Sequence, residues 1–356
     1  MLDTRLTEKL GCRYPIVQTA MGWVADPRLV AGSGNAGAFG FLAGATIPAD
    51  EIERDILRVK ELTDKPFGVN FHMYQPNAAD IVELVIRHGV RAVSYSRSPG
   101  PEFIRKLKDA GVVCMPTVGL PKHAIKAVEL GADVVTVQGG EGGGHTGAIP
   151  TTLLIPQVID AVGDKVPVVA AGGFKDGRGL LAAMAWGADG IAMGTRFLMT
   201  LESPVPRETL QRYIDCSNPG NIVVSKAMDG LPQRMIMNEL LTELEKAGTL
   251  RKLLIALRNG LAFRKHSGAT VLGLLKSALA MSRDDDMTAA QAIMSANAPM
   301  IIQKAMVEGE PARGVLPSGQ VAGVIDELLS CEDLINAIVK EAQERLALLA
   351  VRAAEN

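Results

Sequence analysis

Residues 134–147, VVTVQGGEGGGHTG, join a short apolar run to a loop that contains six glycines and one histidine. The apolar run is rich in β-branched residues and predicts a buried β-strand. The glycines end this strand, and His145 is one of only five histidines in the chain. Two interpretations are open at this point. Either the loop is an ordinary turn, or its backbone is cleared for a ligand that the imidazole faces.

Seven further apolar runs of this kind precede residue 200. They comprise residues 15–20, 39–44, 67–72, 92–96, 112–118, 166–173 and 190–197. Helix-like stretches with charged faces, such as ADEIERDILRVKEL and EFIRKLKDAG, separate them. Continuous apolar strands that alternate with helices are typical of a parallel sheet. Eight such units in about 200 residues predict an α/β fold of the TIM (β/α)8 barrel type. The absence of GxGxxG after the first strand disfavours the Rossmann alternative.

The pattern changes after the eighth predicted strand. From about residue 218 the strand signal is lost and basic helical stretches such as RKLLIALRNGLAFRK follow. We therefore predict three parts: a barrel over residues 1–217, a helical lid inserted after strand eight over 218–300, and a C-terminal segment over 301–356 that returns to the barrel.

Composition excludes several classes of protein. A formal net charge of −2 disfavours a nucleic-acid binder, which needs a basic field to neutralise phosphates. No apolar run approaches the ~20 residues of a membrane span, and the charges scattered over the first residues lead us to expect no signal peptide. The cysteines have no CxxC spacing, so neither a metal site nor a disulfide framework is expected. We expect a soluble cytoplasmic protein without nucleic-acid or membrane partners. The oligomeric state stays open, a homodimer included.

The barrel prediction locates the active site at the carboxyl ends of the strands. Glycines follow both the seventh and the eighth predicted strand, at Gly172, Gly173 and Gly194, the last before Thr195. Bare backbone amides at these two loops often hold a phosphate, although tight turns alone would also explain the glycines. Neutral groups follow other strands, including Met21, Asn70 and Gln138. They suit a flat, uncharged ring and so favour FMN over a sugar phosphate.

Two histidines lie at predicted strand ends. His145 is either a loop histidine bonded to a carbonyl or a base beside the cofactor, because imidazole titrates near neutral pH. His72 either shapes a pocket or contacts the substrate.

Several motifs together resemble those of the nitronate monooxygenase (2-nitropropane dioxygenase-like) family of FMN-dependent barrels. They are QGGEGGGHTG, AAGGFKDGRGL and GADGIAMGTRF, with PIVQTAMGWVA near the start and SGQVAGVIDELLSCEDLI near the end. The resemblance implies a catalytic histidine at His145. It also implies FMN bound by the segments that contain Met21, Asn70, Gln138, Gly144, Gly172, Gly173, Gly194 and Thr195.

The family is broader than its name, and this chain departs from its commonest pattern with EGGGH in place of EAGGH and TAM after Gln18. The chain looks most similar to a steroid-degradation branch. That branch implies NAD-coupled, FMN-dependent dehydrogenation of a hydroxylated bicyclic carboxyl-CoA. Basic residues of the predicted lid, Arg251, Lys252 and Arg258, would then contact the CoA end, although charge runs also form solvated helix faces.

The expected reaction assigns His145 the proton of the substrate hydroxyl, while a hydride passes to the flavin and NAD(H) serves as electron partner. Alternatives are a nitronate monooxygenase that uses O2, an NADH:quinone reductase and an enoyl-thioester reductase. A barrel that binds FMN without turnover has little need for a titratable group. A phosphosugar isomerase or aldolase is disfavoured because Glu141 is the only acid or lysine at a predicted strand end.

Overall fold

The computed structural model describes residues 2–45, 47–72, 75, 77–96, 100–247 and 298–354. The chain divides into two compact units. The barrel unit comprises residues 1–142, 146–204 and 327–356, and the second unit comprises Gly143–His145 and Val205–Asp326.

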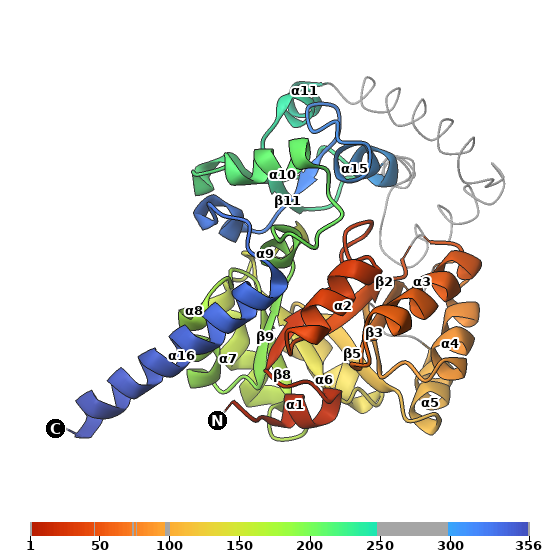
Figure 1. Cartoon of the computed structure of the whole chain (residues 1–356), viewed down its shortest axis with the longest axis vertical. Coiled ribbons are helices and arrows are strands. Elements are labelled where there is room, and N and C mark those ends of the chain that lie inside the picture. The colour runs from red at the N-terminus through yellow and green to blue at the C-terminus, as the bar shows by residue number, and fades with distance from the viewer. Residues whose placement is uncertain are drawn as a thin grey trace. The chain divides into compact units, whose positions relative to one another are not determined.

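Eight parallel strands close the barrel (Figure 1). They are β1 (Ile16–Gln18), β2 (Phe39–Ala43), β3 (Gly68–His72), β4 (Ala92–Ser96), β5 (Val113–Val118), β6 (Val135–Gln138), β8 (Val168–Ala171) and β9 (Gly190–Met193). Val17 pairs with both Phe39 and Ala192, so β1 joins β2 to β9 and completes the circle. Each strand lies within one of the eight predicted runs. The predicted TIM barrel is confirmed.

Helices surround these strands on the outside of the barrel (Figure 1). They are α2 (Pro27–Asn35), α3 (Ala49–Leu62), α4 (Ala78–Arg87), α5 (Pro101–Asp109), α6 (Pro121–Glu129), α7 (Thr151–Val162) and α8 (Gly177–Ala185). Helix α1 (Arg5–Leu10) precedes β1, and its Leu6 and Leu10 pack in one core cluster with Val17 and Phe39 of the strands. The short α9 (Thr195–Leu198) follows β9. Helix α3 buries Ile52, Ile56 and Val59, a spacing that gives one apolar stripe. The strands are buried on both faces, which explains their continuous apolar sequences.

The C-terminal helix α16 (Cys331–Ala354) belongs to the barrel unit, where it packs against α8 and α2. Its buried face includes Leu334, Ile335 and Ile338. The units divide after Pro204 and after Asp326, whereas the sequence suggested divisions near residues 217 and 300. Most of the predicted lid, residues 248–297, lies outside the described residues, so the lid stays a prediction.

The second unit contains a small antiparallel sheet. The strands of this sheet are β10 (Ile222–Ser225), β11 (Gln233–Ile236), β12 (Leu316–Pro317) and the two-residue β7 (Gly144–His145). The described helices of the unit are α10 (Arg207–Ile214), η1 (Pro219–Asn221), α11 (Glu239–Lys246), α15 (Ala298–Met306) and η2 (Gln320–Val324). The prediction that strands end before residue 218 was wrong. Strand β11 pairs with the neighbouring β10, and also with β7 and β12, which come from distant parts of the chain. Local pattern does not reveal such pairing. Within the described part of the chain, no helix is long and apolar enough to span a bilayer.

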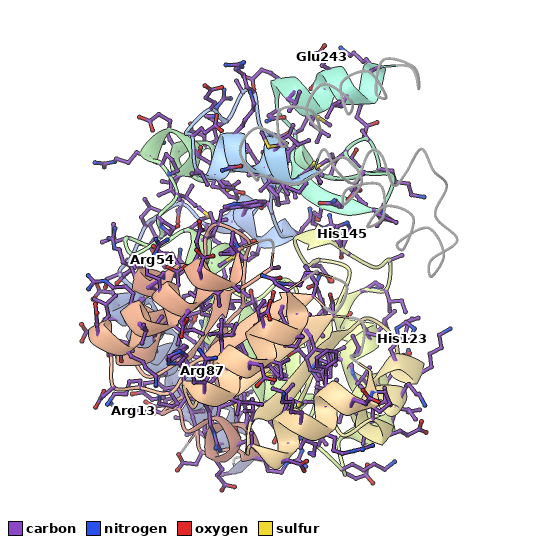
Figure 2. All side chains as sticks on the ribbon, turned by 90° about the vertical axis from the view of Figure 1, so that its right-hand side faces the viewer. Arg13, Arg54, Arg87, His123, His145 and Glu243 are labelled. Atoms are coloured by element: carbon purple, nitrogen blue, oxygen red, sulfur yellow. The ribbon has the colours of Figure 1, made fainter. Side chains whose placement is uncertain are left out.

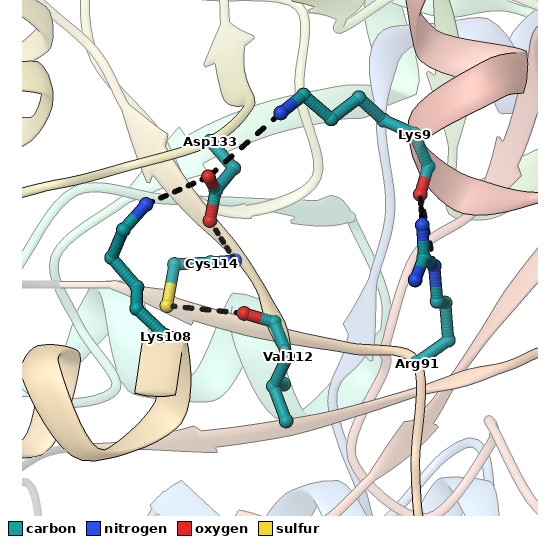
Figure 3. Close-up of polar contacts among 6 residues, drawn as sticks. All are labelled: Lys9, Arg91, Lys108, Val112, Cys114 and Asp133. Carbon is teal, nitrogen blue, oxygen red and sulfur yellow. Dashed lines mark hydrogen bonds and ion pairs between the residues drawn. The ribbon is translucent and has the colours of Figure 1, made fainter. Parts of the chain in front are cut away.

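The four cysteines are free thiols, and three of them are buried. Burial raises the pKa of Cys12 and of Cys114 to about 12, and it also raises the pKa of Cys216 and Cys331. At Cys114 the negative charge of Asp133 adds to this effect, since the carboxylate lies close enough for its Oδ2 to accept the Cys114 amide at 3.1 Å (Figure 3). Lys108 also pairs with this carboxylate at 2.8 Å.

These thiols are expected to react slowly in the native protein. Near pH 8, a pKa of about 12 lowers the thiolate fraction by about 1,000-fold relative to an ordinary cysteine. Reaction with a disulfide reagent, followed by absorbance with and without guanidinium, should show fast modification only after unfolding. One thiol that reacts rapidly and stoichiometrically in the native protein would contradict this expectation.

Candidate functional site

The loops after β6 and β8 meet at positions where only glycine fits. Gly172 and Gly173 have φ values of +101° and +85°, which L side chains rarely adopt. A Cβ at Gly172 would lie 3.0 Å from Thr151 Oγ1 and 3.1 Å from the Gly139 carbonyl oxygen. The close approach of the two loops therefore requires glycine at this position, and consecutive backbone amides without side chains suit a phosphate.

The loops after β1 and β9 also lie close together. A Cβ at Gly194 would lie 3.0 Å from Thr19 Oγ1 and 3.4 Å from Met21 Sδ. Thr195 follows as the first residue of α9. The structure thus brings Met21, Gly194 and Thr195 together at the carboxyl ends of two paired strands.

Two half-buried amide side chains complete the barrel part of the site. Asn70 Nδ2 donates to both the carbonyl oxygen and the hydroxyl of Ser94, each at 3.0 Å, which orients the amide at the end of β3. Gln138 lies against Gly142, where a Cβ would approach its Nε2 to 2.5 Å. Both groups are neutral.

These residues fit a flavin mononucleotide. A cradle without side chains suits its phosphate, and oriented neutral amides suit the polar edge of its ring. Glu141, the carboxylate of the glycine loop, binds the protein itself: its Oε2 accepts the Thr151 amide at 2.9 Å at the start of α7. Glu141 therefore anchors the loop, which further disfavours the isomerase and aldolase alternatives.

His145 lies on β7 in the second unit, and Figure 2 shows its side chain. Its Nε2 is 2.9 Å from Asp229 Oδ2 and 3.1 Å from Gln233 Nε2. The His145 side chain is 60% exposed, whereas that of Asp229 is 3% exposed. Gly144, the other residue of β7, has a φ of +66° and pairs with Arg234 of β11. The observed partner of Nε2 is a buried carboxylate, an arrangement that orients an imidazole for proton transfer.

Comparison with known proteins identifies the family. The model of the nitronate monooxygenase family matches residues 3–341. The chain belongs to the nitronate monooxygenase family. Members of this family are flavin-dependent oxidoreductases, so this protein is an enzyme that uses a flavin.

Two relatives are similar over nearly the whole of both chains. The chain is 50% identical over 353 residues to a (3aS,4S,5R,7aS)-5-hydroxy-7a-methyl-1-oxo-octahydro-1H-indene-4-carboxyl-CoA dehydrogenase of Rhodococcus jostii, with 99% of each chain covered. The protein of the same description from Mycobacterium tuberculosis is 48% identical, with 96% of each covered. Among solved structures, FabK from Thermotoga maritima superposes with a TM-score of 0.81 at 29% identity, covering 99% of this chain and 100% of FabK.

Of the residues predicted to contact the substrate, the structure describes only His72. His72, at the end of β3, is exposed, and its Nδ1 lies 3.2 Å from Ser96 Oγ on the neighbouring strand. Arg251, Lys252 and Arg258 lie outside the described residues. His123, in contrast, is exposed on the outer helix α6 (Figure 2).

The sequence did not indicate that Asp229 and Gln233 lie beside His145. An Asp-Gly pair at residues 229–230 signals a turn, but nothing local links it to a histidine 84 residues away. Trp23, after β1, has a φ of +60°, an unusual conformation for a large side chain that often marks functional loops.

Proposed function

We propose that this enzyme is an FMN-dependent, NAD-coupled dehydrogenase of a hydroxylated bicyclic acyl-CoA. The observation that carries the proposal is the 50% identity with the Rhodococcus jostii dehydrogenase across 99% of both chains. That name describes a hydroxy-oxo-octahydroindene joined to CoA. A dehydrogenase passes electrons to an acceptor other than oxygen, and the resemblance to the steroid-degradation branch makes NAD the proposed acceptor.

The cofactor in this proposal is FMN, held by the barrel loops. The amides of Gly172, Gly173, Gly194 and Thr195 would bind its phosphate. Asn70, Gln138 and the Met21 backbone would contact the ring. Two close approaches support these assignments: the loop after β1 meets the loop after β9, and the loop after β6 meets the loop after β8. When bound, the flavin supplies the acceptor for the hydride that leaves the carbinol carbon.

His145 is the proposed base. As the carbinol C–H and O–H bonds break and the carbonyl forms, its imidazole would take the hydroxyl proton. The exposed side chain and the carboxylate at Nε2 support this role. The residues on either side of Gly143–His145, Gly142 and Thr146, belong to the barrel unit, so the base is continuous in sequence with the glycine loop after β6.

The remaining contacts concern the substrate. His72, with Ser96, is a proposed polar contact for the bicyclic part, because its side chain is exposed at a strand end. The basic residues Arg251, Lys252 and Arg258 remain proposed contacts of the CoA phosphates. Oxidation of alkyl nitronates with O2 is the second candidate, since the family model carries that name.

Anaerobic reduction of the flavin-loaded enzyme tests the proposal. The hydroxy-acyl-CoA named above should bleach the flavin absorbance, and NADH should bleach it in a separate sample. An alkyl nitronate should leave it unchanged. Bleaching by the nitronate alone would overturn the proposal in favour of the second candidate. Bleaching by the acyl-CoA but not by NADH would overturn only the assignment of NAD.

A further inference from the structure

We infer that Asp229 and Gln233 are positioning residues that set the tautomer and orientation of His145. The inference deepens the proposed function and rests on it for the role of His145 in proton transfer. It is carried by three side chains of the second unit and by the turn and strands that hold them.

The backbone register places His145 opposite Gln233. In the antiparallel pair of β7 and β11, Gln233 faces His145 and Arg234 faces Gly144. Side chains of directly opposed residues project from the same face of a sheet. The Gln233 side chain, which is buried, therefore lies beside the imidazole, and its Nε2 is 3.1 Å from His145 Nε2.

The Asp229 carboxylate is held by its own turn. Between β10 and β11 the chain turns through Gly230, whose φ is +84° and whose amide donates to the Lys226 carbonyl at 3.0 Å. Asp229 Oδ1 accepts the Leu231 amide, also at 3.0 Å. The other oxygen, Oδ2, accepts from Gln233 Nε2 and lies 2.9 Å from His145 Nε2. A carboxylate this deeply buried requires such donors, because burial without them is costly.

These contacts determine where the imidazole proton lies. His145 Nε2 and Gln233 Nε2 both lie within hydrogen-bond distance of one acceptor, Asp229 Oδ2. The arrangement that satisfies the carboxylate therefore has the His145 Nε2–H and the Gln233 amide both donating to it. The neutral ring then carries its lone pair on Nδ1. The opposite tautomer would turn a lone pair toward a buried carboxylate. Once a proton is accepted at Nδ1, the same carboxylate stabilises the imidazolium.

The tautomer can be measured on the resting protein, without substrate. Nitrogen-15 NMR of histidine-labelled enzyme at alkaline pH, with His145→Ala to assign the signal, should show a protonated Nε2 and an unprotonated Nδ1. Asp229→Asn should reduce that tautomer in favour of the other. An unchanged tautomer in Asp229→Asn, or a native ring protonated at Nδ1, would overturn the inference. This outcome does not depend on the identity of the substrate, so it is distinguishable from failure of the proposed function.

Kinetics give the second test. Asp229→Asn should slow flavin reduction by the acyl-CoA about 10- to 100-fold, less than the 10²–10⁴-fold that acid–base catalysis itself contributes. If Asp229 acts through His145, the same substitution should change the rate of the His145→Ala variant less than about twofold. Independent, multiplying effects would refute a positioning role.

Asp189 offers a matched control because its carboxylate is also buried and hydrogen-bonded. It accepts from Arg5 at 3.0 and 2.8 Å and from the Val168 amide at 3.0 Å. Asp189→Asn should lower the melting temperature but leave the rate and the His145 tautomer unchanged. If Asp189→Asn altered the tautomer as Asp229→Asn does, the effect would be general destabilisation and the inference would fail.

Discussion

Replacing His145 with alanine is expected to lower the turnover number by about 10²- to 10⁴-fold while the flavin remains bound. The proposed hydroxyl proton would lose its acceptor, whereas the barrel loops proposed to bind FMN would be unaltered. Stopped-flow reduction under anaerobic conditions measures the rate, and the visible spectrum reports the bound flavin. Because the substitution removes a donor from the buried Asp229 carboxylate, it should also lower the free energy of unfolding by about 1–3 kcal/mol, which thermal denaturation measures.

His123→Ala is the matched control for this variant. His123 is exposed on the outer helix α6, away from any predicted strand end (Figure 2). Its substitution should leave the turnover number unchanged. Native turnover in His145→Ala with flavin bound would show that the imidazole takes no part in the reaction.

Replacing Gly172 with valine is expected to yield protein that is purified without flavin, with FMN affinity lowered by about 100-fold or more. The φ of +101° is strongly unfavourable for a β-branched residue, and the Cβ would press on Thr151 Oγ1 and the Gly139 carbonyl. The loop would have to shift from the position proposed to bind the phosphate. Titration of the apoprotein with FMN, followed by flavin fluorescence, measures the loss.

Gly111→Val separates backbone strain from loss of the cradle. Gly111 has a φ of +73°, but a Cβ there meets nothing within 4 Å. This variant should lose stability through backbone strain, seen in its melting temperature, and still bind FMN normally. If both variants bound FMN with native affinity, the loop after β8 would not be the phosphate site.

The barrel was predictable because each of its units is local. All eight strands lie within the runs read from the sequence, since a strand buried on both faces must be apolar throughout. For the same reason the sequence could predict that Asn70, Gln138, Gly172 and Gly194 lie at one end of the barrel, because the carboxyl ends of parallel strands share one edge.

The second unit was not predictable in this way. Its sheet joins β7, β10, β11 and β12, whose members come from residues 144–145, 222–236 and 316–317. The two-residue β7 carries no periodic signal of its own, and helix was wrongly expected where β10 and β11 lie.

By itself the sequence determined the barrel and the histidine at its glycine loop. Only the tertiary structure decided what holds that histidine, because His145 and Asp229 are 84 residues apart and meet through pairing of β7 with β11. Strand formation and glycine turns follow from short-range propensity and burial. A hydrogen bond between distant residues depends on strand register, which is settled only when the sheet assembles.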